Sequence, residues 1–256
     1  MLQPICDPRA RCKCCDGAAP LYGVVDLNKN CEVARQVVLP CCGIPVYYYR
    51  CANCKFLFTT FFDGFTPADF ARVIYNDDYL LVDPDYVSAR PGANAAMLQE
   101  LFSASKPNRL LDFGGGNGTL ARLLANKGFA HVDCYDPYIA RYSQKPPHQY
   151  DCIVSFEVLE HLTDPIRALA DLNDLLADPG LVLFSTLLQP DNIDQLGLTW
   201  WYAGPRNGHV SLYSRESLLR LAQRFGLKLA SFNQNLHLLF RNPPAWSRHF
   251  LHLPSN

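Results

Sequence analysis

Short apolar runs alternate with helical patterns through the middle of the chain. Residues 109–113 form the first apolar run, which predicts a buried strand. Four glycines within residues 114–118 end that run, and leucines then recur on one helical face over residues 119–127. The pattern therefore predicts a strand, a glycine turn and a helix in direct succession.

The same alternation continues toward the C-terminus. It predicts strands over 131–137, 151–156 and 181–186, helices over 165–177 and 214–225, and a final antiparallel pair over 227–232 and 237–240. Strands that alternate with helices indicate an α/β fold with a mostly parallel sheet. Only residues 137–150 separate the second strand from the next, so the third strand and its helix must be shortened or missing.

The pattern differs before residue 109. Residues 47–49 and 56–58 predict two strands of a hairpin, and two helices follow over 66–75 and 91–102. The first helix has clear start signals, with Thr66 as N-cap and proline at its first position. These helices either connect two parts of the chain or cover a ligand on the sheet.

Composition limits the class of protein. The chain has 256 residues, of which 49% are hydrophobic and 18% charged, as expected for a globular protein. A net charge of -1 gives no general attraction to nucleic acid or anionic lipid. No apolar run reaches the roughly 18–20 residues that span a bilayer, and the N-terminus lacks the apolar core of a signal peptide. We therefore expect a cytoplasmic protein with no membrane partner.

Cysteine is the unusual component. Nine of the eleven cysteines lie before residue 55, which indicates a metal-binding segment more than a disulfide framework. Two C-x2-C pairs, Cys12 with Cys15 and Cys51 with Cys54, suit a structural zinc ion because each pair aims two sulfurs at one metal. The predicted hairpin brackets the second pair, as in a zinc ribbon.

Two alternatives to this ligand set remain. The 35 residues between the pairs exceed the usual spacing, so Cys41 or Cys42 could replace one member or form a second partial site. The cysteines could also be small buried side chains without a metal. A catalytic zinc is disfavoured, because such sites usually include histidine or carboxylate ligands.

The glycine turn carries a more specific pattern. Asp112 stands two positions before Gly114, and glycines recur at Gly116 and Gly118. Glycine permits a sharp turn close to a ligand, and the helix start that follows offers free N–H groups. The pattern resembles motif I of class I S-adenosylmethionine (SAM) methyltransferases. The resemblance implies that these four residues bind SAM.

Two later segments fit the same cofactor class. Asp136 ends the second predicted strand, where a carboxylate can accept hydrogen bonds from ribose hydroxyls, and Asp133 in mid-strand is the competing choice. Phe156 and Glu157 end the next strand, at the edge where open α/β sheets bind ligands. The run EVLEHL over 157–162 resembles the segment after the fourth strand of ubiquinone-biosynthesis-type methyltransferases.

Together the motifs imply a Rossmann-like class I methyltransferase sheet, mostly parallel with an antiparallel last strand, and a small N-terminal zinc-ribbon-like segment. The cysteine pairs resemble those of methyltransferases with an N-terminal zinc-binding segment, some of which act on sugars. We expect the zinc-ribbon-like segment over 1–60, a helical connector or cofactor cover over 61–108, the methyltransferase domain over 109–242 and a tail over 243–256.

The implied activity is transfer of a methyl group from SAM to a small-molecule acceptor, a sugar or another metabolite, at oxygen, nitrogen or carbon (EC 2.1.1.-). One alternative is an NAD(P)-dependent oxidoreductase, since Asp136 suits either cofactor. Another is a non-catalytic zinc-ribbon module that binds nucleic acid or protein. Residues 1–55 contain seven basic and four acidic residues without a dense basic run, which does not favour nucleic acid. No feature of the sequence predicts an oligomeric state.

Candidate catalytic residues follow from the chemistry of the acceptor. A hydroxyl, a carbon or a protonated amine needs a base, and imidazole titrates near neutral pH. His209 and His161 are therefore the candidates, and Tyr213 is a third. For either histidine, orienting a loop is the alternative role.

An irregular stretch over 192–207 is the candidate substrate loop. Trp200 and Trp201 could wall a planar or sugar substrate, and Arg206 could hold an anionic group. The alternative is that these side chains anchor the loop to the core.

Overall fold

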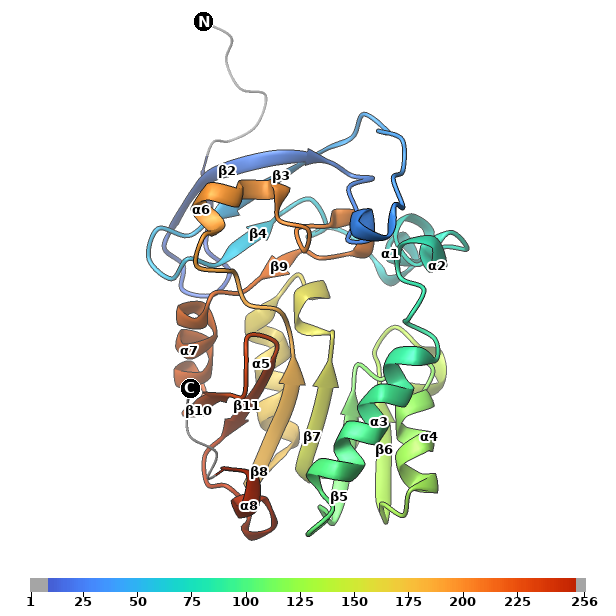
Figure 1. The fold of residues 1–256 in the computed structure, drawn as a ribbon. Coiled ribbons are helices and arrows are strands. Elements are labelled where there is room, and N and C mark those ends of the chain that lie inside the picture. The colour runs from blue at the N-terminus through green and yellow to red at the C-terminus, as the bar shows by residue number, and fades with distance from the viewer. Residues whose placement is uncertain (1–8, 252–256) are drawn as a thin grey trace, which may run out of the picture. The chain divides into compact units, whose positions relative to one another are not determined.

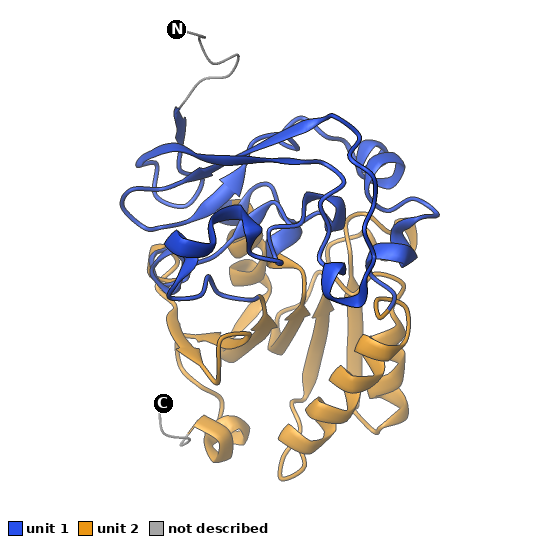
Figure 2. Cartoon of the chain, turned by 45° about the horizontal axis from the view of Figure 1, so that its top comes forward, with its two compact units in different colours: residues 1–84, 160–166, 187–221 blue, residues 85–159, 167–186, 222–256 orange. Residues whose placement is uncertain are grey.

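The computed structural model describes residues 9–251, which form two compact units (Figure 2). Unit 1 comprises the described part of Met1–Pro84 together with Glu160–Ile166 and Leu187–Leu221. Unit 2 comprises Asp85–Leu159, Arg167–Thr186 and the described part of Ala222–Asn256. The units are discontinuous in sequence, whereas the sequence predicts consecutive parts. The difference arises because late segments of the chain pair with the N-terminal strands.

Unit 1 is built on a five-stranded antiparallel sheet with the order β1-β2-β3-β4-β9 (Figure 1). Its strands are β1 (Arg9–Arg11), β2 (Ala18–Asp26), β3 (Pro45–Arg50), β4 (Leu57–Thr59) and β9 (Ser211–Leu212). The predicted hairpin is confirmed by β3 and β4, in which Tyr49 lies opposite Phe58. β9 joins from much later in the chain, with Leu212 opposite Leu57.

Short helices complete unit 1. They are η1 (Val33–Arg35), α1 (Pro67–Val73), α2 (Tyr79–Val82), α6 (Ile193–Leu196), η4 (Gly197–Thr199) and η5 (Pro205–Asn207). The predicted start of α1 is confirmed, because Thr66 Oγ1 accepts the Asp69 N–H at 3.3 Å and the Asp69 carboxylate accepts the Thr66 N–H at 3.0 Å. Aromatic side chains fill the core, among them the buried Tyr48, Phe62 and Phe70.

Unit 2 is a six-stranded sheet with the order β10-β11-β8-β7-β5-β6 (Figure 1). Its strands are β5 (Arg109–Phe113), β6 (His131–Tyr135), β7 (Tyr150–Phe156), β8 (Leu176–Ser185), β10 (Lys228–Ser231) and β11 (Leu236–Phe240). Strands β8, β7, β5 and β6 are parallel, and β11 and β10 are antiparallel. The predicted fold class is confirmed. Within the described chain, only η2 (Ala140–Tyr142) lies between β6 and β7, so the third strand is missing as predicted.

Helices pack on this sheet and connect the units. α3 (Ala89–Leu101) and α4 (Thr119–Asn126) belong to unit 2, whereas η3 (Leu159–His161), α5 (Pro165–Leu175) and α7 (Arg215–Arg224) cross from one unit to the other. The core of unit 2 joins buried residues of α3 and α4 to the apolar strands β5, β7 and β8. Among residues 9–251, no helix combines the length and apolar character needed to cross a membrane.

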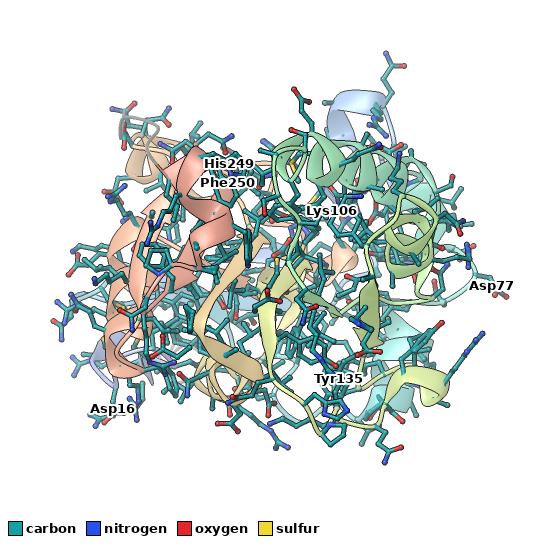
Figure 3. All side chains as sticks on the ribbon, turned by 90° about the horizontal axis from the view of Figure 1, so that it is seen from below. Asp16, Asp77, Lys106, Tyr135, His249 and Phe250 are labelled. Atoms are coloured by element: carbon teal, nitrogen blue, oxygen red, sulfur yellow. The ribbon has the colours of Figure 1, made fainter. Side chains whose placement is uncertain are left out.

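The C-terminal segment packs on unit 2. The sequence predicts a loose tail over 243–256, but η6 (Ala245–Ser247) and α8 (Arg248–Leu251) are helical, and residues 252–256 lie outside the described chain. Phe250 is buried in the core of unit 2, and His249, labelled beside it in Figure 3, donates from Nε2 to the Leu101 carbonyl at 2.8 Å. Apolar burial therefore holds this segment in place.

Candidate cofactor site and cysteine cluster

The glycine loop leaves β5 in a conformation that ordinary residues avoid. Gly114, Gly116 and Gly118 have φ of +74°, +55° and +72°, which lie in the left-handed region. The Gly114 N–H donates to the Tyr135 carbonyl at 2.7 Å, which ties the loop to the end of β6. The alternating glycines are therefore required by the backbone path that leads into α4.

Space around the loop differs from one glycine to the next. A Cβ added at Gly114 would lie 2.5 Å from Val158 Cγ2, so that position is closed by the protein itself. A Cβ added at Gly116 would meet nothing nearer than the Tyr86 hydroxyl at 4.0 Å. The backbone at Gly116 thus faces open space, as a loop that receives a ligand must.

Asp112, in β5, lies beneath the loop. It is buried, and its Oδ2 has no hydrogen-bond partner within residues 9–251. Burial raises the pKa of the Asp112 carboxyl to about 7, and the charge of Asp136 adds to the rise. A Cβ added at Gly115 would lie 2.4 Å from this oxygen, so the carboxyl is packed directly under the loop.

The raised pKa makes stability depend on pH. The folded chain retains the Asp112 proton up to about pH 7, whereas an unfolded aspartate loses it near 3.8. The stability contributed by the retained proton is therefore full at low pH and is lost as pH rises through about 7. Asp112→Asn lacks this dependence on pH. We therefore expect its free energy of unfolding, relative to that of the unmodified chain, to be about 2–3 kcal/mol higher at pH 8 than at pH 5. Urea unfolding of both proteins at each pH measures these free energies. If the two proteins differ by the same amount at pH 5 and pH 8, the pKa of Asp112 is not raised.

Asp136 directly follows β6 and contacts the glycine loop. Its Oδ2 accepts the Gly116 N–H at 2.9 Å, and its Oδ1 accepts the Tyr138 N–H at 2.9 Å. Burial raises the pKa of this carboxyl, although these backbone donors oppose the rise. The competing candidate, Asp133, accepts the Tyr150 hydroxyl at 2.7 Å within the sheet. Asp136 is therefore the carboxylate positioned beside the loop.

Phe156 and Glu157 stand where β7 ends. Phe156 packs against the core of unit 2, and Glu157 has φ of +53°, a conformation that is strained for a residue with a side chain. Ser185 holds this conformation, since its hydroxyl accepts the Glu157 N–H at 2.9 Å and donates to Glu157 Oε1 at 2.6 Å. The carboxyl ends of β7 and β8 are thus tied together.

The candidate bases lie in unit 1. His161 and His209 come from distant parts of the sequence, yet their ring centroids are 5.0 Å apart. Tyr213 is fully buried, and burial raises the pKa of its hydroxyl well above the ordinary value. The structure therefore brings the two histidines together and makes Tyr213 a poor proton acceptor.

The candidate substrate loop over 192–207, called the aromatic loop below, mostly packs within unit 1. Trp200 is buried in the core of unit 1, while Trp201 is 50% exposed. The Arg206 guanidinium is buried and donates to the Ile74 carbonyl and to Asn76 Oδ1, each at 2.8 Å. These contacts favour the anchoring interpretation for Trp200 and Arg206, and leave Trp201 as the exposed member of the three.

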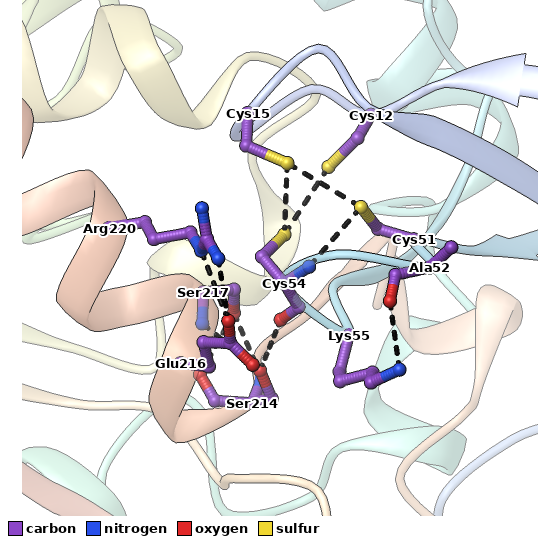
Figure 4. Close-up of polar contacts among 10 residues, drawn as sticks. All are labelled: Cys12, Cys15, Cys51, Ala52, Cys54, Lys55, Ser214, Glu216, Ser217 and Arg220. Atoms are coloured by element: carbon purple, nitrogen blue, oxygen red, sulfur yellow. Dashed lines mark hydrogen bonds and ion pairs between the residues drawn. The ribbon is translucent and has the colours of Figure 1, made fainter.

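The four predicted zinc ligands form one cluster in unit 1 (Figure 4). The sulfur of Cys54 lies 3.5 Å from those of Cys12 and Cys15, and Cys15 lies 3.5 Å from Cys51. A tetrahedral zinc ion with bonds of about 2.3 Å would place its sulfurs about 3.8 Å apart. The spacing suits a shared metal and is too long for a disulfide.

The two cysteine turns have the same backbone conformation and the same hydrogen bond. Asp16 and Lys55, which follow the second cysteine of each pair, have φ of +58° and +61°. Each donates its N–H to the carbonyl of the first cysteine, at 2.8 Å for Cys12 and 3.1 Å for Cys51. Hydrogen bonds from neighbouring thiols lower the pKa of Cys12, whereas the contact with Cys12 and burial raise the pKa of Cys54. The repeated turn, which brings the two sulfurs of each pair to one side, is what a thiolate metal site requires.

The remaining N-terminal cysteines that the structure describes lie outside the cluster. Cys41 and Cys42 are exposed, and the Cys42 thiol donates to Asp26 at 3.3 Å. Cys14 and Cys31 are buried, and burial raises the pKa of each thiol. The alternative ligands at positions 41 and 42 are therefore not part of the four-sulfur group.

The sequence did not link two further residues to the histidines. The Tyr202 hydroxyl donates to Glu160 Oε1 at 2.7 Å, and the Tyr202 carbonyl accepts from His209 Nδ1 at 2.8 Å. Glu160 belongs to the EVLEHL run and Tyr202 to the aromatic loop, but no spacing rule links segments so far apart. Only tertiary structure reveals this contact.

Comparisons with known proteins agree with the fold. A family model described as a methyltransferase domain matches residues 86–231. The ubiquinone biosynthesis O-methyltransferase of Dinoroseobacter shibae is 37% identical over 76 residues, which cover 30% of this chain and 30% of that protein. The protein of the same name from Klebsiella pneumoniae is 34% identical over 77 residues, which cover 30% and 32%. The chain thus matches about a third of the length of these relatives.

Solved structures show the same fold at low sequence identity. An O-methyltransferase family protein from Burkholderia thailandensis has a TM-score of 0.51 at 12% identity, with 71% of this chain and 64% of that chain covered. Human N-acetylserotonin methyltransferase in complex with SAM has a TM-score of 0.52 at 14% identity, with 68% and 59% covered. At these identities the similarity concerns the fold.

Proposed function

The chain belongs to the methyltransferase domain family, and on that premise we propose that it transfers the methyl group of SAM to a small-molecule acceptor. The observation that carries the proposal is the glycine loop, whose backbone at Gly116 faces open space and donates its N–H to the Asp136 carboxylate. Methyl transfer from a sulfonium is an in-line displacement, so the protein must mainly hold the donor, align the acceptor and exclude water.

The residues of unit 2 supply the cofactor contacts in this proposal. The loop from Gly114 to Gly118 would receive SAM at the start of α4, and Asp136 would accept its ribose hydroxyls. Asp112, packed under the loop, would hold the loop in place. Phe156 and Glu157, at the end of β7, would line the same edge of the sheet.

We propose oxygen as the acceptor atom. The relatives from Dinoroseobacter and Klebsiella are named O-methyltransferases, although the matched segment is short. A hydroxyl acceptor needs a base, and His209 is the first choice, with His161 second. Incubation of a metabolite extract with isotope-labelled SAM, followed by mass spectrometry of labelled products, would identify the acceptor.

Asp136 provides the direct test of the cofactor. We expect S-adenosylhomocysteine to bind the unmodified chain and Asp136→Ala to weaken that binding by roughly 10–100-fold, because a charged hydrogen bond contributes about 1.5–3 kcal/mol. Isothermal titration calorimetry measures both affinities. Asp133→Asn, within β6 three residues earlier, is the matched control and should bind normally.

The alternative functions predict binding of other ligands. Thermal stabilisation by NADH but not by S-adenosylhomocysteine would favour the oxidoreductase. Absence of binding by either ligand, together with salt-sensitive retention on RNA or DNA, would favour a binding module. Either result would overturn the methyltransferase proposal for this chain.

A further inference from the structure

The N-terminal sheet of unit 1 holds the backbone at His209, the first candidate base. The Tyr48 hydroxyl, in β3, donates to the His209 carbonyl at 2.7 Å. The Thr59 N–H, at the end of β4, donates to the Val210 carbonyl at 3.1 Å. The next two residues form β9, which pairs with β4. The backbone of the histidine therefore depends on the β3–β4 hairpin for its position.

The same hairpin closes at the second cysteine turn. Cys51 and Cys54 lie between β3 and β4, and the Cys51 N–H donates to the Phe56 carbonyl at 2.8 Å. Both sulfurs lie 3.5 Å from that of Cys15, within the four-sulfur cluster. β4 has only three residues, and a hairpin of two short strands is marginally stable by itself. Zinc held by the four thiolates would stabilise the hairpin, because metal binding at such sites is coupled to folding.

Two side chains from later in the chain join the cysteine turn to the segment that carries the histidine. The Ser214 hydroxyl donates to the Cys54 carbonyl at 2.7 Å (Figure 4). Gln189 Nε2 donates to the carbonyls of Lys55 and Leu212, each at 2.8 Å. A change in the cysteine turn is therefore transmitted to β9 and to the residues that follow it.

We propose that the cysteine cluster, when it holds zinc, positions the imidazole of His209, and that Tyr48, Gln189 and Ser214 are the positioning residues between them. Tyr48 is fully buried, so a His209 carbonyl that lost this hydroxyl would have no easy replacement from water. The sheet that carries the cysteines is then part of the acceptor site. The role of His209 as base rests on the proposed function, whereas its link to the cysteines lies in contacts within unit 1.

Hydrogen–deuterium exchange of the full chain, with zinc bound and after its removal by a chelator, tests the link. We expect the amides of residues 51–56 and 209–214 to exchange at least about 10-fold faster without zinc, because both segments lose the same support. The amides of β5 and β7, in unit 2, should exchange as before. If residues 51–56 lose protection while residues 209–214 keep it, the cluster does not position the histidine. An equal loss in β5 and β7 would also overturn the proposal, because zinc would then support the whole fold.

Tyr48→Phe separates the positioning contact from the metal site. It keeps the ring and all four sulfurs and removes the hydrogen bond to the His209 carbonyl. Zinc content should be unchanged, whereas the amides of residues 209–212 should exchange roughly 2–10-fold faster, as expected for one lost hydrogen bond. The ring signals of His209 in the NMR spectrum of histidine-labelled protein should also shift. Tyr47→Phe, at the neighbouring position of β3, is the matched control and should leave all three measurements unchanged.

The role of Tyr48 is wrong if Tyr48→Phe has the exchange rates and the His209 ring signals of the unmodified chain. Binding of S-adenosylhomocysteine, measured by calorimetry on the same samples, tests the methyltransferase proposal separately. We expect zinc removal to leave this affinity unchanged, because the proposed cofactor contacts lie in unit 2. If no sample binds S-adenosylhomocysteine, the methyltransferase proposal fails, while the exchange rates still decide the link between the cysteines and the histidine.

Discussion

We expect the four-sulfur cluster to hold a structural zinc ion, which Cys54→Ser should remove while it lowers the free energy of unfolding by several kcal/mol. Cys54 contacts the sulfurs of Cys12 and Cys15, each at 3.5 Å, and its carbonyl accepts the Ser214 hydroxyl at 2.7 Å (Figure 4). A structural zinc ion contributes roughly 10–16 kcal/mol of apparent binding energy in small domains, and total stability is only about 5–15 kcal/mol. Loss of one thiolate should therefore destabilise much of unit 1.

The measurements are zinc content by elemental analysis and the unfolding transition by calorimetry. Cys41→Ser is the matched control, because Cys41 is exposed and lies outside the four-sulfur group. We expect the control to retain zinc and to unfold as the unmodified chain does. Equal zinc content and equal stability in both variants would show that the cluster is not a metal site.

Gly116→Ala is expected to weaken S-adenosylhomocysteine binding by more than about 10-fold, or about 1.4 kcal/mol. The added methyl group would enter the open space above the loop, where the nearest atom of the protein is 4.0 Å away. Folding should suffer only from the left-handed backbone, which costs a residue with a side chain roughly 1–2 kcal/mol. The variant therefore separates binding of the cofactor from stability of the chain.

Gly226→Ala isolates the backbone cost. Gly226 also lies in unit 2, has φ of +67° and has nothing within 4 Å of an added Cβ. We expect both variants to lose similar stability in urea unfolding, but only Gly116→Ala to lose affinity in calorimetry. If both bind S-adenosylhomocysteine equally well, the glycine loop does not receive the cofactor.

The elements that the sequence predicts correctly are those specified by residues close together in the chain. Asp112 and the alternating glycines specify a strand, a left-handed turn and a helix within a few residues, and the structure confirms all three elements. The missing third strand was also predictable, because residues 137–150 are too few for a strand and a helix. In each case the determining groups are close together in sequence.

The boundaries of the two units depend on contacts between residues that are far apart in the sequence. Parallel strands and late edge strands pair over long distances, so a contiguous reading of the chain cannot group β9 with β4. The segment after Pro243 has helix-breaking prolines at its start, yet burial of Phe250 outweighs that signal. Packing energy, which depends on the whole chain, decides such cases.

The sequence by itself determined the glycine loop beside Asp112 and the two cysteine turns, because backbone sterics and short spacing act within a few residues. Tertiary structure alone decided that the four sulfurs share one centre and that Cys41 and Cys42 do not join it. It alone also brought His209 to Glu160 and His161, since long-range packing sets which distant side chains meet.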